Sequence, residues 1–386
     1  MSKTEDLAMR KIKFKRSGKE KSSVKSKSRR WNVQEKIFLF LVVVILILGS
    51  LNIVKAKGWL IPESKDFFVQ GKTVDLSQMP LEKKIAQMII VHGSTWNEGA
   101  WKRLGVGGIH LFALANADIY KEIIQGYQKR STIPLLVSAD FEGCLNPFSN
   151  FHQSTAVSEI NTHEEAFNKG KEDGKFMKGL GFTLNFAPVV DLEDEIWKCR
   201  SFPGDEKEVS ELAEAYILGL QEAKIISTAK HYPGGTLVGN DPHKQLVTAT
   251  IKEQDLYPYQ QLIGSEVIDS IMVSHLITNG AVNSEGYPSV ASEDVVGALK
   301  GEFNGLVISD EIQMAGLRDF YDTLDEMYLA VFKSGNDLIL NFDEDPLEVY
   351  RMVKVVEEAV QRGEISEERI DNSVRKILTV KGLVVE

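Results

Sequence analysis

The sequence contains few of the cysteines that stabilise small folds through disulfide bonds. Of its 386 residues only Cys144 and Cys199 are cysteines, so no disulfide framework defines the fold. Each cysteine lies just beyond a predicted strand. Buried small side chains are the preferred interpretation, and a pair that meets is the alternative. Stability must therefore come mainly from core packing, which a chain with 43% hydrophobic residues can supply.

Metal-binding and nucleotide-binding motifs are also missing. The seven histidines and the acidic residues show no HExxH-like ligand spacing, and no glycine-rich loop suited to a phosphate is evident. There is no internal repeat, and no low-complexity segment past residue 36. We therefore expect neither a catalytic metal nor another cofactor.

Positive charge is scarce outside the N-terminus. Residues 1–36 hold thirteen Lys and Arg against four Asp and Glu, so residues 37–386 carry a net charge of −19 within a whole-chain charge of −10. Phosphates attract clustered Lys and Arg, and an acidic domain offers few of them. Nucleic acid is therefore disfavoured as a partner.

One long apolar run is present. Ile37–Val54 reads IFLFLVVVILILGSLNIV, eighteen residues without a charge. A helix of this length reaches about 27 Å, close to the roughly 30 Å of a hydrocarbon core. The basic region before it is 36 residues long and no convincing cleavage site follows it, unlike in a cleaved signal peptide. An uncleaved signal anchor is preferred to a cleaved signal peptide.

The flanking charges predict the orientation of this anchor. Basic residues precede the run, and only Lys55 and Lys57 follow it, so the N-terminus is expected in the cytoplasm and the large domain outside the cell membrane. The basic, Lys/Ser-rich tail is suited to disorder and to anionic lipid head groups. The predicted parts are a cytoplasmic tail (1–36), a single transmembrane anchor (37–54), a stem or linker (55–75) and a barrel domain (76–386).

The large domain alternates short apolar runs with amphipathic stretches, which indicates parallel strands and crossover helices. Eight runs are present: Ala86–His92, Gly107–Phe112, Pro134–Asp140, Thr183–Asp191, Ile226–His231, Ser270–His275, Gly305–Asp310 and Asp337–Asn341. Eight strands in about 310 residues predict an α/β fold, a single (β/α)8 barrel of the TIM type, preceded by the transmembrane helix. An open doubly wound sheet is the structural alternative.

Polar groups end five of these runs: Asp140, Asp191, His231, His275 and Asp310. In a barrel the carboxyl ends of the strands converge on one face, where active sites are built. A single Asp at a strand end is often only a helix N-cap. Five polar strand ends together favour a functional site.

The segment GNDPHKQL contains an Asp and a His two residues apart. Pro242 favours an extended Asp241, which lets Asp241 and His243 point to the same side. A carboxylate that accepts the imidazole N–H favours the imidazolium and keeps a proton available for a leaving group. The pair predicts a general acid, and the alternative is an exposed loop histidine beside an incidental Asp.

Several segments occur in the order found in glycoside hydrolase family 3, which the chain therefore resembles. They are VSADFEG, NFAPVVDL, RSFPGDEKEVSELAEAYILGLQEA, KHYPGGTLVGNDPH, IMVSH and GEFNGLVISDEIQM. The chain looks most like the family's single-barrel β-N-acetylglucosaminidase branch, and the similarity runs from about Leu81 to the C-terminus. The resemblance implies that Asp310 is the nucleophile and His243 the acid and base, with Asp241 orienting His243.

The resemblance also assigns sugar-binding residues. Asp140, Arg200, Lys230 and His231 match positions that hold sugar hydroxyls in the family. Arg200 and Lys230 near Asp310 would keep that carboxylate ionised. Salt bridges at the barrel mouth are the structural alternative for each residue.

Two stretches depart from the family's pattern. The sequence DFEGCLNPF places Cys144 where relatives have a second Gly, and Phe148 where an Arg would bind the sugar. The acid loop reads PGGT in place of PGHG, and Pro242 replaces a small hydroxyl residue. These departures bear on the substrate and the rate more than on the type of reaction.

The leading hypothesis is a membrane-anchored exo-β-N-acetylglucosaminidase that acts outside the cell by a retaining mechanism on β-linked N-acetylglucosamine in cell-wall fragments. Another family 3 β-glycosidase or a phosphorylase is the enzymatic alternative. A weakly active or inactive membrane-tethered glycan-binding protein is the alternative of another class, motivated by the two departures at Cys144 and Phe148.

Overall fold

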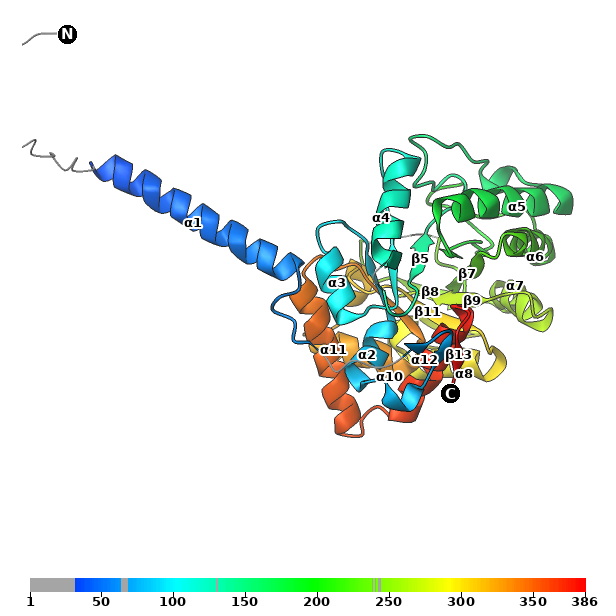
Figure 1. Cartoon of the computed structure of the whole chain (residues 1–386). Helices are drawn as coiled ribbons and strands as arrows, with labels where there is room; N and C mark the ends of the chain where they lie inside the picture. The colour runs from blue at the N-terminus through cyan, green and yellow to red at the C-terminus, as the bar shows by residue number, and fades with distance from the viewer. Residues whose placement is uncertain (1–31, 64–68, 130, 238, 240, 242–243) are drawn as a thin grey trace, which may run out of the picture. The chain divides into compact units, whose positions relative to one another are not determined.

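The computed structural model describes residues 32–63, 69–129, 131–237, 239, 241 and 244–386 (Figure 1). Its contacts divide the chain into two units, Met1–Ser50 and Leu51–Glu386. The described part of the first unit is mostly helix α1 (Val33–Ala56), which continues into the second unit. This helix is long and apolar enough to cross a membrane, and its apolar window has no buried residue; a signal sequence has the same properties.

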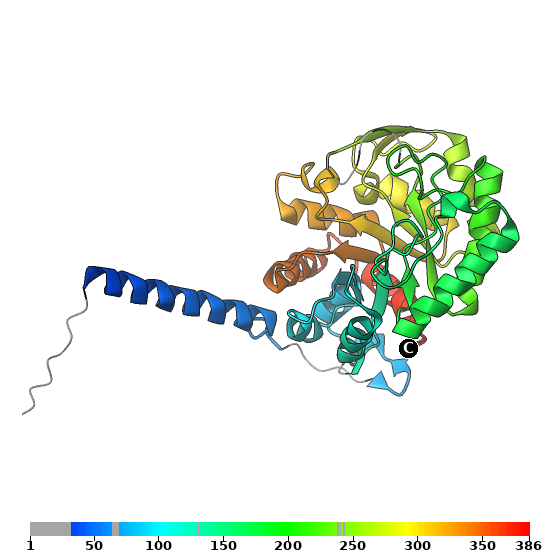
Figure 2. The same cartoon turned by 90° about the horizontal axis from the view of Figure 1, so that it is seen from above.

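The second unit contains a closed barrel of eight parallel strands, with helices around it (Figure 2). In chain order the barrel strands are β3 (Ile89–His92), β4 (Gly108–His110), β5 (Leu136–Ala139), β6 (Leu184–Asn185), β7 (Ile226–Tyr232), β9 (Ser270–Val273), β11 (Leu306–Glu311) and β12 (Leu338–Asn341). Each one overlaps a different predicted run, so the barrel is confirmed. Pairing of β12 with β3 closes the barrel and rules out an open sheet.

The strand boundaries differ from the predicted runs at some ends. The first run begins at Ala86, but helix α2 (Leu81–Gln87) occupies its start and β3 begins only at Ile89. Burial is continuous from the end of α2 into β3, because residues 84–91 are all buried, so the pattern alone does not separate the end of the helix from the strand. Strand β7 extends one residue beyond its predicted run, to Tyr232.

The crossover helices form the outer layer of the barrel (Figure 1). After α2 they are α3 (Glu98–Leu104), α4 (Ala117–Lys129), α5 (His163–Leu180), α6 (Glu206–Glu222), α7 (Glu253–Gly264), α8 (Glu293–Glu302), α9 (Ala315–Arg318), α10 (Leu324–Ser334), α11 (Pro346–Gln361) and α12 (Glu367–Val380). Capping boxes begin α5 at Thr162 and α6 at Asp205, where side chains satisfy backbone N–H groups that lack a helical partner.

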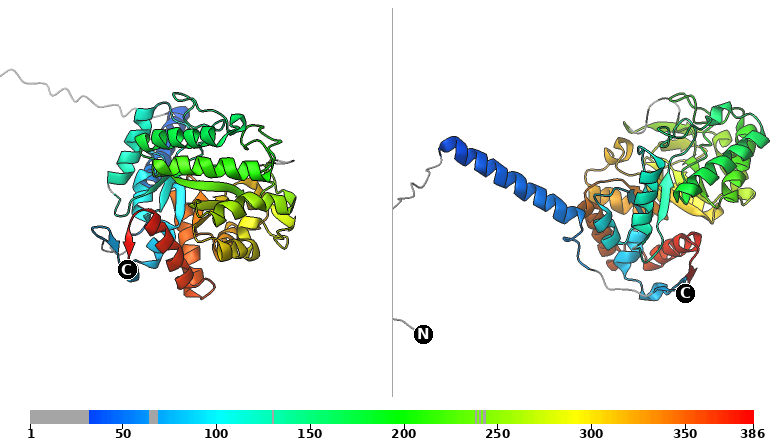
Figure 3. Two further views of the ribbon diagram at one scale, coloured as in Figure 1. Left: turned by 90° about the vertical axis from the view of Figure 1, so that its right-hand side faces the viewer. Right: turned by 45° about the horizontal axis from the view of Figure 1, so that its top comes forward.

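Helix α5 follows strand β5 and helix α6 follows strand β6, and the two helices lie side by side (Figure 3). Glycine allows this close approach, because a Cβ atom at Gly170 would lie 2.0 Å from the carbonyl oxygen of Tyr216 on α6. The two helices therefore form one packed layer behind strands β5, β6 and β7.

Two small sheets lie outside the barrel, and the sequence patterns did not reveal them. One joins β1 (Val69–Gln70), β2 (Thr73–Val74) and the C-terminal strand β13 (Val384–Val385). The other pairs β8 (Thr248–Ile251) in parallel with β10 (Ile277–Gly280). None of these strands lies in one of the eight apolar runs, and their pairing depends on tertiary contacts.

The range predicted as a stem, 55–75, contains residues that pack into the second unit. Ala56, Ile61 and Val74 are buried, and Lys55 forms an ion pair with Asp345 at 2.8 Å. The division into tail, anchor, stem and barrel domain remains a prediction.

The two cysteines correct the sequence-based interpretation. Cys144 and Cys199 form a disulfide with a Cα–Cα distance of 6.1 Å. Cys144 is exposed and Cys199 is half-buried, so buried small side chains were the wrong choice. The bond joins the segment after β5 to the segment after β6, two connections that meet only in the folded barrel.

Candidate active site

A cavity of about 580 Å³ lies at the carboxyl ends of the barrel strands. Six of the seven predicted site residues line it: Asp140, Arg200, Lys230, His231, Asp241 and Asp310. The seventh, His243, lies outside the described residues. The structure thus brings the predicted residues of five different segments to one pocket, while their catalytic and binding roles remain predictions.

A cluster of two cations and two carboxylates forms one side of this pocket. The buried Nζ atom of Lys230, near the end of β7, lies 2.6 Å from Oδ1 of Asp140 and 2.6 Å from Oε1 of Glu142. Arg200 completes the cluster through two bonds to Glu142, 2.7 and 2.9 Å long. These four groups are called the charge cluster below.

The charge cluster shifts the pKa values of its members. Burial raises the pKa of Asp140, but Lys230, His110 and Arg200 together outweigh it and lower that pKa to about 2. For Glu142, burial is likewise outweighed by Arg200 and Lys230, which lower its pKa. Burial lowers the pKa of Lys230, but the two carboxylates raise it above its ordinary value. All members are therefore charged at neutral pH.

Glu142 is the main residue that the sequence analysis missed. Its side chain is fully buried and bridges Arg200 and Lys230. Its position two residues after Asp140, in an extended segment, was the available signal, because such residues point to the same side. Without Glu142, Arg200 would lose the carboxylate that offsets its desolvation, and Lys230 would keep only Asp140.

A second buried pair fixes His231. Its Nδ1 lies 2.8 Å from Oδ2 of Asp191, and its Nε2 lies 3.4 Å from Nη2 of Arg200. Arginine can only donate, so Nε2 accepts and Nδ1–H donates to Asp191. Asp191 also accepts from the backbone N–H of Thr236 at 3.0 Å. Strand-end Asp191 therefore orients His231 instead of binding substrate directly.

Asp310 lies on β11, next to the last residue of that strand, and its Oδ1 accepts from the backbone N–H of Glu311 at 2.8 Å. Oε1 of Glu311 accepts from the backbone N–H groups of Phe342 and Gln313, both at 3.0 Å. Burial, together with the nearby charge of Asp310, raises the pKa of Glu311 to about 7 despite these bonds. Asp310 and Glu311 are adjacent in the chain, yet their carboxylates lie in different environments.

Asp241 is half-buried at the pocket, and its carboxylate lies 3.2 Å from Nζ of Lys244. The predicted pairing of Asp241 with His243 falls outside the described residues. The loop between β7 and β8 therefore reaches the pocket at Asp241, as a general acid on this loop would require.

The remaining walls of the pocket are largely apolar. They include Phe112, Phe186, Phe342, Leu145, Pro147, Trp197 and Met314. Met314 is half-buried and also lines the pocket. A pocket with charged groups on one side and aromatic rings on the others suits a sugar. A sugar has polar hydroxyl groups at its edges and apolar C–H groups on its faces. Among the described residues, no group of three or more His, Cys, Asp or Glu side chains is arranged to hold a metal.

Phe148 explains one departure from the family's pattern. Its side chain is fully buried and packs against the rings of Tyr120, Phe141, Phe151, Phe176 and Phe182, with centroid distances of 5.0–6.2 Å. It supports the segment after β5 from behind, where a charged residue would have no partner. The missing Arg is thus replaced by a core residue, not by another sugar-binding group.

Comparisons with known proteins agree with this geometry. Residues 80–380 match the model of the glycosyl hydrolase family 3 N terminal domain. The β-hexosaminidase LpqI of Mycobacterium tuberculosis is 29% identical over 327 residues, 78% of this chain and 82% of that protein. A β-hexosaminidase of Haemophilus influenzae is 30% identical over 272 residues, 65% of this chain and 77% of that protein.

Solved structures give the same result. The crystal structure of a glycosyl hydrolase of the GH3 family from Mycobacterium smegmatis superimposes with a TM-score of 0.73 at 27% identity, covering 80% of this chain and 99% of that one. The structure of M. tuberculosis LpqI gives a TM-score of 0.72 at 26% identity, covering 80% and 95%.

The aromatic packing of Phe148 predicts the effect of two substitutions. Phe148→Ala should lower the free energy of unfolding by about 3–5 kcal/mol, because it leaves a cavity. Phe148→Arg should cost more, because it buries an unpaired charge. Urea unfolding followed by circular dichroism measures both. A Phe148→Arg variant as stable as the wild type would show that position 148 opens to the pocket.

The raised pKa of Glu311 predicts a pH dependence of stability. Its ordinary value is 4.5 and its folded value about 7, so the folded state holds a proton between these values that the unfolded state has lost. Glu311 thus contributes full stability below pH 4.5, and this contribution is lost as the pH rises through about 7. Glu311→Gln should raise the Tm relative to the wild type increasingly from pH 4.5 to 7.

The control for this measurement is Glu122→Gln, on an exposed position of α4. Its Tm should follow the wild type at every pH. A constant Tm difference between Glu311→Gln and the wild type from pH 4.5 to 8 would contradict the raised pKa.

Proposed function

Because this chain belongs to glycosyl hydrolase family 3, we propose that it is an exo-acting β-N-acetylglucosaminidase. It would remove terminal β-linked N-acetylhexosamine from glycan chains. The similar relatives named β-hexosaminidases support the activity. The observation that carries the proposal is the convergence of Asp310, Asp241 and three members of the charge cluster, Asp140, Arg200 and Lys230, on one cavity.

The reaction would proceed in two steps. Asp310 attacks the anomeric carbon with a carboxylate oxygen, while the bond from that carbon to the leaving oxygen breaks. His243 donates a proton to the leaving oxygen, and Asp241 stabilises the imidazolium that donates it. In the second step His243 removes a proton from water, the water oxygen attacks the anomeric carbon, and the Asp310 carboxylate leaves. Two inversions give net retention.

The charge cluster would bind the terminal sugar before this reaction. Lys230 and Arg200 are fixed donors, and Asp140 is an ionised acceptor with a partly exposed side chain. Their orientation is set by Glu142 from behind, so little reorganisation is needed when a sugar arrives. Trp197 and Phe112 supply apolar surface for the sugar's C–H face.

The location proposed for the barrel, outside the membrane, would suit a cell-wall substrate. The apolar helix α1 has the length of a membrane anchor, and the basic residues before it favour an orientation with the barrel outside the cell. The Cys144–Cys199 disulfide favours the same side, because disulfides persist in oxidising compartments. We therefore propose that the enzyme acts on peptidoglycan-type fragments close to the outer surface of the membrane.

The test uses the full chain in detergent with p-nitrophenyl β-N-acetylglucosaminide and β-glucoside. Asp310→Asn keeps the shape of the side chain but removes the nucleophile, so turnover of the N-acetyl substrate should fall on the order of 10⁴-fold. The matched control Asp118→Asn, at an exposed position on α4, should retain wild-type turnover.

Other outcomes separate the alternatives. Preference for the glucoside would assign another β-glycosidase activity, and a glycosyl phosphate product in phosphate buffer would indicate a phosphorylase. A folded chain that binds N-acetylglucosamine without turnover would be a glycan-binding protein.

A further inference from the structure

The segment between β6 and α6 carries two pocket residues on irregular backbone. Trp197 and Arg200 both line the cavity, yet no helix or strand holds residues 192–204. Arg200 is nonetheless buried and must keep one orientation to bind Glu142. Other interactions must therefore fix this segment.

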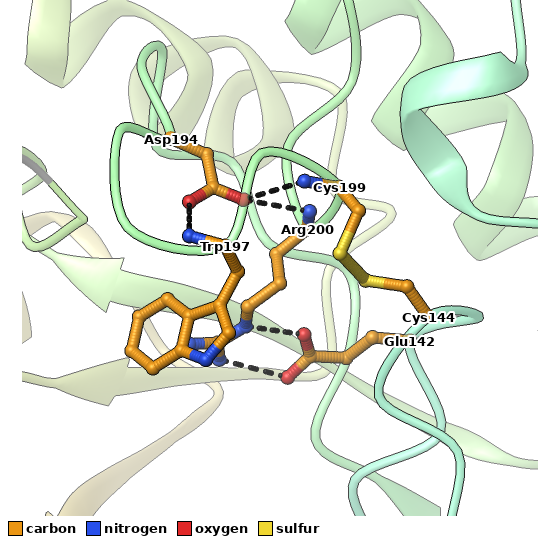
Figure 4. The surroundings of a disulfide bond; sticks show 6 residues. All are labelled: Glu142, Cys144, Asp194, Trp197, Cys199 and Arg200. Atoms are coloured by element: carbon orange, nitrogen blue, oxygen red, sulfur yellow. Dashed lines mark hydrogen bonds and ion pairs between the residues drawn. A yellow bond between two sulfur atoms is a disulfide. The ribbon is translucent and has the colours of Figure 1, made fainter.

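The first of these interactions is internal to the segment. The carboxylate of Asp194 accepts from the backbone N–H groups of Trp197, Cys199 and Arg200 at 2.8, 2.9 and 2.8 Å (Figure 4). Burial raises the pKa of Asp194, but these backbone bonds lower it below its ordinary value. The bonds fold the segment around one carboxylate, without fixing it to the barrel.

Two crosslinks then attach it to the segment after β5. The disulfide joins Cys199 to Cys144, and the adjacent residue Arg200 binds Glu142, two residues before Cys144 (Figure 4). Gly143 separates the two anchor points, with φ of 104°. A Cβ atom there would lie 2.2 Å from the carbonyl oxygen of Thr155, so the backbone at the anchor is closely confined.

The crosslinked segment places an indole beside the charge cluster. The guanidinium carbon of Arg200 lies 4.7 Å from the ring centroid of Trp197. Arg200 is thus held by a carboxylate along its edge and by the indole across its face. A rotation of residues 197–200 would move both groups in the pocket wall at once.

We propose that the Cys144–Cys199 disulfide is a positioning element of the sugar site, and that Trp197 is the sugar-binding residue it places against the bound sugar. This inference rests on the proposed function, which supplies the terminal N-acetylglucosamine as the ligand. Without the disulfide, Arg200 and Trp197 sample more orientations, and binding must first restore the productive one. Loss of the disulfide should therefore weaken substrate binding more than it slows the chemical step.

The barrel itself does not depend on this bond. Strands β5 and β6 pair directly, and α5 packs closely on α6 through Gly170. Loss of the disulfide should therefore leave the folded barrel intact and alter the pocket wall. This separates a positioning role from a stabilising one.

The test compares the full chain with Cys144→Ser/Cys199→Ser, in which neither thiol remains. Before it, alkylation of the denatured wild type should label no cysteine without reductant and two after reduction; two labels without reductant overturn the proposal. The double variant should raise KM for p-nitrophenyl β-N-acetylglucosaminide and Kd for N-acetylglucosamine about tenfold, with kcat changed less than about twofold. A lowered Tm with unchanged KM and Kd would show a stabilising bond only and overturn the proposal.

A double-mutant cycle with Trp197→Ala tests the link between the two groups. Trp197→Ala leaves the backbone bonds to Asp194 possible and should raise KM and Kd by itself. Combined with the two serine substitutions it should raise them by less than the product of the separate effects, because the disulfide acts through Trp197. If the effects of Trp197→Ala and of the two serine substitutions on KM and Kd simply multiply, this role of Trp197 is overturned. Cys144→Ala/Cys199→Ala serves as the matched control and should reproduce the serine variant.

The Kd readout distinguishes this inference from the proposed function. A wild type that binds N-acetylglucosamine without turnover would refute the hydrolytic activity, and the effect of the variants on Kd would still decide the role of the disulfide. A folded wild type that neither turns over nor binds N-acetylglucosamine would overturn both.

Discussion

The rest of the site depends on the ion pairs that the buried Lys230 ammonium group forms with Asp140 and Glu142. The side chain of Lys230 is 2% exposed, so its charge is stable only with Asp140 and Glu142 beside it. These partners come from the segment after β5, and Glu142 in turn binds Arg200 from the segment after β6. One buried cation therefore determines how two irregular segments meet at the barrel's end.

The other features of the pocket follow from this constraint. Arg200 must reach Glu142, so its segment is held by Asp194, by the disulfide and by the indole of Trp197. The segment after β5 must hold Glu142 in place, so Phe148 is buried in aromatic packing behind it. Opposite charges pair within the cluster, and Asp310 on β11 completes the cavity from another strand.

The sequence predicted the barrel because apolar runs and strand-end polar groups are local patterns. Asp140, Lys230, His231 and Asp310 were found in this way or by family resemblance, and all of them line the pocket. The disulfide was the alternative and not the preferred interpretation of the two cysteines, because a separation of 55 residues does not reveal which loops meet. The packing of Phe148 into the core and the bridging of Arg200 and Lys230 by Glu142 likewise depend on contacts between segments that are distant in the chain. His243 lies outside the described residues, so its role rests on the sequence.

The most direct measurement for the account is capture of the glycosyl-enzyme on 5-fluoro-N-acetylglucosaminyl fluoride. The C5 fluorine slows both steps by destabilising an oxocarbenium-like transition state, while the fluoride leaving group lets the first step proceed. Peptide mass spectrometry should then find one fluorinated sugar on the carboxylate of Asp310. A label on another residue such as Glu311, or steady turnover of the reagent without any labelled peptide, would contradict the account.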